Sequence, residues 1–108
     1  MDFSDDDEYI ENTEETTNLY VFATLTKLCR QKSLSESEKQ IVKDALENKS
    51  VDVDYENGSL LISASSWGNS DMVSILLNAG AKKNINNNRA YVLAKQNNKL
   101  EVLKLISL

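Results

Sequence analysis

With 108 residues, of which 41% are hydrophobic and 27% charged, the chain has the length and composition of one small globular domain with a modest core. It holds no histidine and a single cysteine, Cys29, so it lacks the commonest general base, the commonest metal ligand and an internal disulfide. No apolar run approaches the roughly 20 residues of a membrane helix, and the acidic N-terminus does not resemble a secretion signal, so we expect a soluble cytoplasmic protein.

The net charge of −5 is unevenly divided along the chain. Residues 1–17 hold eight acids and no base, whereas the remaining 91 residues hold nine acids and twelve bases. A run of like charges repels itself and stays solvated, so we expect residues 1–16 to form a disordered acidic tail. Direct binding of DNA or RNA normally needs a basic surface and is not expected here. The eight acids are Asp2, Asp5, Asp6, Asp7, Glu8, Glu11, Glu14 and Glu15.

Two amphipathic helices are expected after this tail. Apolar side chains recur at helical spacing over residues 17–31, and a second such pattern ends near Asn48. The short link between the two patterns predicts an antiparallel helical hairpin. Candidate N-caps of the first helix are Thr16, Thr17 and Asn18. Two overlapping capping-box patterns precede the second helix, namely Ser33 with Glu36 and Ser35 with Glu38.

The following segment, residues 51–58, reads as extended and ends in the turn dipeptide Asn57-Gly58. That dipeptide is also typical of a tight β-hairpin. Two short apolar segments come next, and they end at Gly68 and Gly80. A glycine can take the left-handed conformation that terminates a helix. We therefore predict two short helices in this region in preference to a sheet.

An internal repeat organises the second half of the chain. A shift of 30 residues places Asp54 on Asn84, and it also superposes Ala64 on Ala94. Repeats of this length are supersecondary units that bury their apolar faces against one another. The sequence therefore predicts a stack of helical units.

Residues 59–81, SLLISASSWGNSDMVSILLNAGA, carry a recognisable pattern. They resemble an ankyrin repeat, matching T-P-L-H-x-A-A-x-x-G-H-x-E-I-V-x-L-L-L-x-x-G-A without a gap. The unit that contains them spans residues 51–81, residues 82–108 resemble a truncated copy, and residues 17–50 look like a divergent N-terminal hairpin. The resemblance implies an all-α fold, an ankyrin-like stack of antiparallel helical hairpins, over residues 17–108.

The chain departs from the ankyrin pattern in three respects. Leu60 and Ala90 stand at the positions of the family's proline, which normally pre-organises a first helical turn. Ile62 and Val92 stand at the positions of its histidine. The period is 30 residues instead of 33, so we expect the protruding hairpin of the family to be clipped or absent.

The resemblance also implies where a partner protein would bind. The corresponding positions in this chain are Tyr55, Glu56, Gly58, Ser66, Trp67, Ile85, Asn86, Asn88, Gln96 and Asn97. Trp67 is the strongest candidate, because it is the only tryptophan, lies outside the apolar periodicity, and falls on the concave face of the resembled fold. Alternatively, Trp67 covers a thin core against the N-terminal helices. Tyr55 and Ile85 are expected either to form one contact strip with Trp67 or to pack locally.

No catalytic, metal-binding or cofactor-binding pattern is found. The carboxylates of residues 5–15 lie in a segment too polar to shift their pKa values, and Cys29 falls on the apolar face of the first helix. At the other end, Leu105 and Leu108 belong to a last helix without a polar cap. We therefore hypothesise self-association of the chain through that helix.

The expected function is that of a non-catalytic protein-interaction module. Such a short array suits a small inhibitor, adaptor or immunity-type factor, of viral or bacterial origin, that binds a partner protein through its concave face. Two alternatives remain open. One is an acidic nucleic-acid mimic that blocks the basic cleft of a nucleic-acid-binding enzyme, and the other is a structural subunit of a homo-oligomer.

Overall fold

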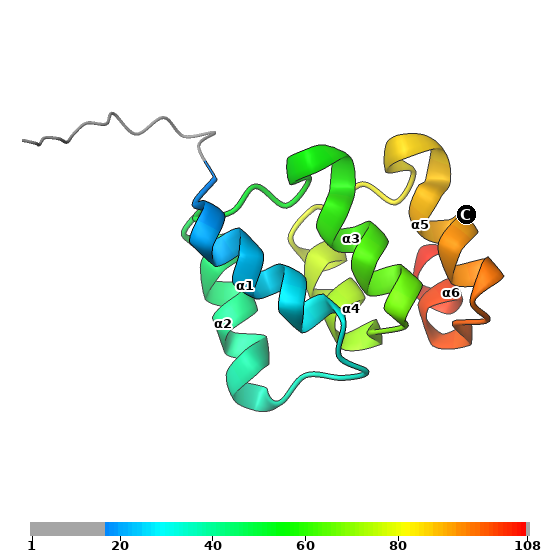
Figure 1. Cartoon of the computed structure of the whole chain (residues 1–108), viewed down its shortest axis with the longest axis horizontal. Helices are drawn as coiled ribbons and strands as arrows, with labels where there is room; N and C mark the ends of the chain where they lie inside the picture. The colour runs from blue at the N-terminus through cyan, green and yellow to red at the C-terminus, as the bar shows by residue number, and fades with distance from the viewer. Residues whose placement is uncertain (1–16, 108) are drawn as a thin grey trace, which may run out of the picture.

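The computed structural model describes residues 17–107, which form six α-helices and, within that range, no strand (Figure 1). The prediction of an all-α fold is therefore confirmed. The expected tail at residues 1–16 and Leu108 lie outside the described residues. No helix in the described part of the chain is long and apolar enough to cross a membrane. The helices are α1 (Leu19–Cys29), α2 (Glu36–Glu47), α3 (Tyr55–Trp67), α4 (Ser70–Asn78), α5 (Ile85–Gln96) and α6 (Leu100–Ile106).

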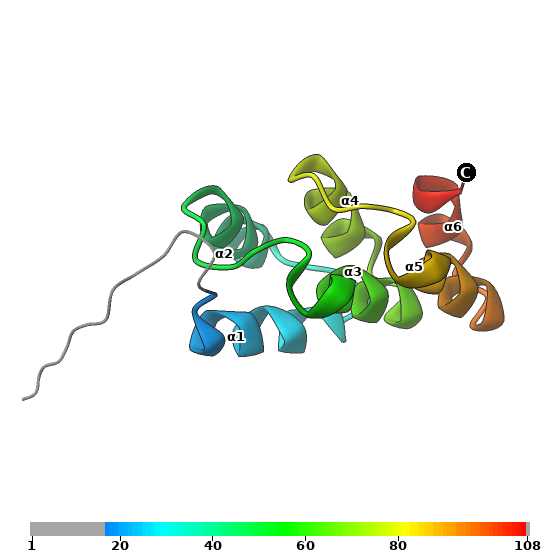
Figure 2. The ribbon, with the colours of Figure 1, turned by 90° about the horizontal axis from the view of Figure 1, so that it is seen from above.

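The six helices are arranged in two layers. Seen from above, α1, α3 and α5 lie side by side in one layer, and α2, α4 and α6 form the second (Figure 2). Helix α3 packs against α1 on one side and α5 on the other, while α4 packs against α2 and α6. Each consecutive pair contributes one helix to each layer. The core lies between the layers and includes Leu25, Val42, Leu60, Leu61, Ala64, Met72, Leu76, Ala90 and Val102.

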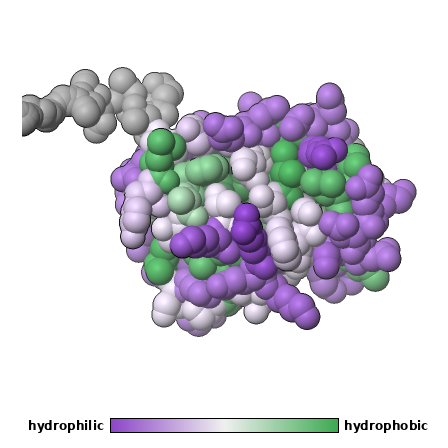
Figure 3. Space-filling view, in the orientation of Figure 1, coloured by the Kyte–Doolittle hydropathy of each residue, from purple (hydrophilic) through white to green (hydrophobic). Residues whose placement is uncertain are grey.

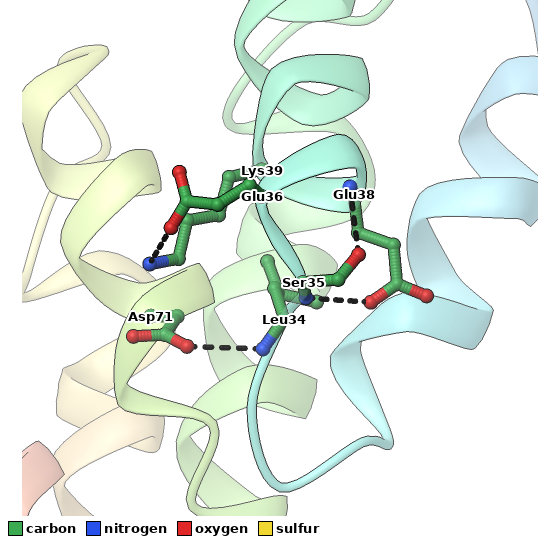
Figure 4. Close-up of polar contacts among 6 residues, drawn as sticks. All are labelled: Leu34, Ser35, Glu36, Glu38, Lys39 and Asp71. Atoms are coloured by element: carbon green, nitrogen blue, oxygen red, sulfur yellow. Dashed lines mark hydrogen bonds and ion pairs between the residues drawn. The ribbon is translucent and has the colours of Figure 1, made fainter.

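The first two helices begin at caps that the sequence predicts. The Asn18 side chain accepts hydrogen bonds from the backbone N–H groups of Tyr20 and Val21, at 3.0 and 3.1 Å. Of the two capping boxes considered for α2, the one made by Ser35 and Glu38 forms (Figure 4). The Glu38 N–H donates to Ser35 Oγ at 3.2 Å, and the Ser35 N–H donates to Glu38 Oε1 at 2.9 Å.

The start of α2 is also tied to α4. The backbone N–H of Leu34 donates to a carboxylate oxygen of Asp71 at 2.9 Å, which links the α1–α2 connection to the first turn of α4 (Figure 4). Glu38 is held by the Ser35 N–H and, through a second bond, by the Gln31 side chain, and these hydrogen bonds lower the pKa of its carboxyl group. Both carboxylates therefore act as acceptors that fix the backbone.

The turn expected at Asn57-Gly58 is left-handed, and the alternative of a β-hairpin is not found among the described residues. Three successive residues, Glu56, Asn57 and Gly58, have φ values of 57°, 56° and 83°. The N–H of Gly58 donates to the carbonyl oxygen of Asp54 at 3.0 Å, which closes this turn. The turn therefore occupies the first residues of α3, and the right-handed part of the helix follows it.

The same left-handed turn recurs one unit later. Asn86, Asn87 and Asn88 have φ values of 56°, 57° and 61°, and the N–H of Asn88 donates to the carbonyl oxygen of Asn84 at 3.2 Å. Asparagine is among the few residues with a side chain that tolerate this region. The run of three asparagines therefore suits the conformation that the backbone adopts there.

The predicted helix ends are present, and two further ends share their geometry. Gly68 and Gly80 have φ values of 80° and 102°, and Lys49 and Asn98 take the same left-handed conformation. In each case the backbone N–H of the following residue donates to the carbonyl oxygen five residues before it. Asn69 N–H, for example, donates to Ala64 O at 2.9 Å. Gly68 and Asn98 lie 30 positions apart, which is the spacing of the internal repeat.

Candidate functional site

The surface formed by the exposed side chains of α1, α3 and α5, here called the odd-helix face, is the one turned toward the reader in Figure 3. Hydrophobic patches on it are separated by hydrophilic side chains (Figure 3). Trp67 is 53% exposed and is the last residue of α3. It lines an open, shallow hollow of about 390 Å³ together with Ser66, Asn97 and Lys99. Among the predicted site residues, Trp67 is thus the large hydrophobic side chain that stands exposed.

Side chains of the neighbouring unit hold this hollow in shape. The Asn97 side-chain amide donates to the backbone oxygen and to the hydroxyl of Ser66, at 3.0 and 3.1 Å. The aliphatic stem of Lys99 lies where a side chain on Gly68 would be. The hollow therefore joins the end of α3 to the α5–α6 connection, and no residue of α1 or α2 lines it.

Tyr55 and Ile85 have packing roles at the opposite end of their helices. The Tyr55 ring meets the Phe22 ring of α1 edge-on, with 4.8 Å between centroids and 74° between planes. The Ile85 side chain lies against the bare Cα of Gly58. Both are half-buried at the first residues of α3 and α5, whereas Trp67 ends α3. Of the two alternatives, packing within the domain therefore describes Tyr55 and Ile85 better than a strip with Trp67, which lies at the other end of α3.

The remaining predicted positions are divided between the two ends of the odd-numbered helices. Glu56 and Asn86 are exposed in the left-handed turns, and Gln96 is exposed at the end of α5. Asn88 is half-buried, and its side-chain oxygen has no hydrogen-bond partner among the described residues. Leu105 of α6, predicted for self-association, is half-buried against the core. Only Ser66, Trp67, Asn97 and the neighbouring Gln96 come together at one end.

Cys29 does not have the environment of a reactive thiol. Its side chain is fully buried, and Sγ lies 3.5 Å from the backbone oxygen of Leu60, to which it donates. Burial raises the pKa of Cys29 to about 12, so the thiol stays protonated at neutral pH. Within residues 17–107 there is no group of three or more His, Cys, Asp or Glu side chains that could hold a metal ion.

The charge of the odd-helix face is a feature that the position-by-position reading of the sequence missed. Helices α1 and α5 contain no aspartate or glutamate, and neither does α3 between Gly58 and Trp67. The exposed cations Lys27 and Arg89 lie on these helices. Counting charges helix by helix, instead of along the whole chain, is the signal that reveals this asymmetry.

Comparisons of the chain with models of known protein families, with curated proteins and with solved structures each found no match.

Proposed function

We propose that this chain is a non-catalytic protein-interaction module that binds a partner protein through the odd-helix face, with Trp67 as the central contact. On this proposal residues 17–107 form a short ankyrin-like array of the kind that serves as an inhibitor, adaptor or immunity-type factor. The repetition of local geometry supports the array. Asn57 and Asn87 share the left-handed turn at a spacing of 30 residues, as do Gly68 and Asn98 at the helix ends.

The exposure of Trp67 is the observation that carries the proposal. Burying an exposed indole against a partner removes a large apolar area from water, which is why tryptophan is enriched among residues that dominate binding. The hydrogen bonds from Asn97 to Ser66 hold the backbone next to Trp67 in place before any partner arrives. A contact that is already ordered loses little conformational entropy on binding.

Capture of partners by the immobilised full chain, from cells of its source or of its host, tests this proposal. Trp67→Ala is compared with Leu100→Ala, because Leu100 of α6 is 65% exposed and lies in the other layer. We expect Trp67→Ala to weaken capture by about 30-fold or more, corresponding to at least roughly 2 kcal/mol, and Leu100→Ala to leave it unchanged. Both variants are expected to keep the melting temperature of the parent chain, since both side chains are more than half exposed.

The opposite pattern would contradict the proposal. If Trp67→Ala retains the partner and Leu100→Ala loses it, the last helix carries the interface. Light scattering of the purified chain then decides whether that interface joins two copies of the chain, which is the self-association expected from Leu105 and Leu108.

A further inference from the structure

The two layers of the molecule differ in the sign of the charge that they expose. Within residues 17–107, the acids lie on α2, α4 and α6, in the connections, and at Glu56 in the left-handed first turn of α3. The layer of α1, α3 and α5 has none between Leu19 and Cys29, between Gly58 and Trp67, or between Asn88 and Gln96. Apart from Glu56 in the first turn of α3, the ionised groups of these three helices are therefore positive, in a chain with a net charge of −5.

One cation lines the Trp67 hollow, and two more lie at the end of α1. Lys99 lines the hollow itself, and Lys27 and Arg30 lie in the last turn and at the C-cap of α1. Within residues 17–107, the ion pairs engage Lys39 with Glu36 at 3.3 Å and Lys104 with Glu101 at 3.5 Å. Those pairs belong to α2 and α6, so the cations of the odd-helix face have no carboxylate partner in the described part of the chain.

The carboxylates closest in sequence to Arg30 and Lys99 are Glu36 and Glu101, which pair with Lys39 and Lys104. Glu38 and Asp71 also have other partners. Glu38 accepts from the Ser35 N–H and from Gln31, and Asp71 accepts from the Leu34 N–H. Neutralisation of Lys27, Arg30 or Lys99 by Glu38 or Asp71 would break bonds that hold α2 in place. Within residues 17–107, the positive charge of these cations is therefore not engaged by a carboxylate.

The uncharged groups in the hollow suit a protein segment better than a nucleic acid. Ser66 and Asn97 offer hydroxyl and amide groups next to one aromatic ring, Trp67. Proteins that bind single strands without sequence preference stack successive bases on several aromatic side chains along a strongly positive groove. A single exposed indole in a chain of net charge −5 does not provide that platform.

We propose that the odd-helix face binds an acidic segment of a partner protein, which sets an apolar side chain against Trp67 and its carboxylates against Lys27, Arg30 and Lys99. This inference rests on the proposed function and adds the chemistry of the partner to it. Complementary charge speeds the encounter and selects the partner, while the indole supplies the buried apolar contact.

Trp67 itself reports on the inference, because it is the only tryptophan in the chain. The full chain is titrated with a synthetic peptide of alternating aspartate and glutamate around one central leucine, and the Trp67 emission is followed. A peptide with asparagine and glutamine in place of every acid is the matched control. We expect the acidic peptide to give a saturable change in emission that weakens as salt is added, because salt screens exposed charges. The neutral peptide is expected to give none.

Two double variants of equal net charge locate the effect. Lys27→Gln with Lys99→Gln removes two cations from the odd-helix face, whereas Lys39→Gln with Lys43→Gln removes two from α2. We expect the first pair to weaken peptide binding by about fivefold, as for two exposed charge pairs, and the second to change it less than about twofold. Equal losses in the two variants would show that only the total charge matters, and would overturn the inference.

Two further outcomes also overturn it. One is equal binding of the neutral peptide, and the other is tighter binding of a thymidine oligonucleotide of matched charge. Neither outcome touches the proposed function, which is judged by whether Trp67→Ala abolishes capture of a cellular partner. If a partner is captured through Trp67 but the peptide titration fails, the proposed interaction module stands. Only the inference that its partner segment is acidic is then overturned.

Discussion

At the scale of single residues, one glycine sets how closely two helical pairs approach. Gly58 closes the left-handed turn with a φ of 83°, and a methyl group on its Cα would overlap the Ile85 side chain of the next unit. Gly80 also has a positive φ, 102°, but nothing lies within 4 Å of where its Cβ would be. A comparison of substitutions at these two glycines therefore distinguishes the cost of backbone strain from the cost of steric overlap.

Gly58→Ala is expected to destabilise the chain more than Gly80→Ala. Both substitutions place a side chain in the left-handed region, which costs about 1–2 kcal/mol. Only Gly58→Ala also displaces Ile85, and overpacking of this kind costs about 1–3 kcal/mol more. Urea unfolding of the two variants measures the difference. Equal losses would mean that Ile85 moves aside without cost and that Gly58 serves the turn alone.

At the scale of elements, the sequence allows two capping boxes for α2 and the structure forms one. Ser35 and Glu38 bond each other's backbone, whereas the Ser33 hydroxyl makes no hydrogen bond within residues 17–107. Because hydrogen bonds lower the pKa of Glu38 below its ordinary value of 4.5, its contribution to stability is complete above that pH. The contribution is lost as the pH falls through the lowered pKa.

Ser35→Ala is expected to lower the free energy of unfolding by about 1 kcal/mol, because the first turn of α2 loses its cap. Ser33→Ala is the matched control and is expected to change it by less than about 0.5 kcal/mol. Thermal unfolding followed by circular dichroism gives both values. A larger loss for Ser33→Ala would mean that α2 begins one turn earlier in solution.

At the scale of the whole molecule, stability depends on contacts between successive pairs of helices. Asn69 caps α4 and also donates from its side-chain amide to the backbone oxygen of Leu28, at 3.0 Å. Asn97 makes the corresponding link from the last pair to Ser66. Units of such a stack cannot bury their apolar faces alone, so each depends on its neighbours.

A chain that ends at Lys83 is therefore expected to lose cooperative unfolding. Without α5, the surface of α3 that receives Ile85 and Asn97 is open to water, and the remaining core is too small to hold two pairs together. Urea titration of this variant is expected to show a broad transition with a reduced m-value. A sharp transition at the midpoint of the full chain would show that the first four helices are independently stable.

Much of the local structure follows from local chemistry. The N-cap Asn18, the capping box at Ser35 and the helix ends at Gly68 and Gly80 each depend on groups within a few residues, so the pattern of residues predicts them. The exposure of Trp67 likewise agrees with its place outside the apolar periodicity. The candidate site could be predicted to this extent and no further.

The side chains that pack against Gly58 and those that surround Trp67 were decided by tertiary packing. Asn57-Gly58 is compatible with a hairpin or a left-handed turn, and the left-handed turn forms, with Ile85, 27 positions after Gly58, packed against the glycine. The hollow beside Trp67 also depends on contacts between distant residues, because the hydrogen bond between Asn97 and Ser66 joins residues 31 positions apart. Helix caps, helix faces and the repeat are determined by the sequence alone, since their interactions are local. The hollow beside Trp67 exists only once separate units stack, since its lining residues come from two units.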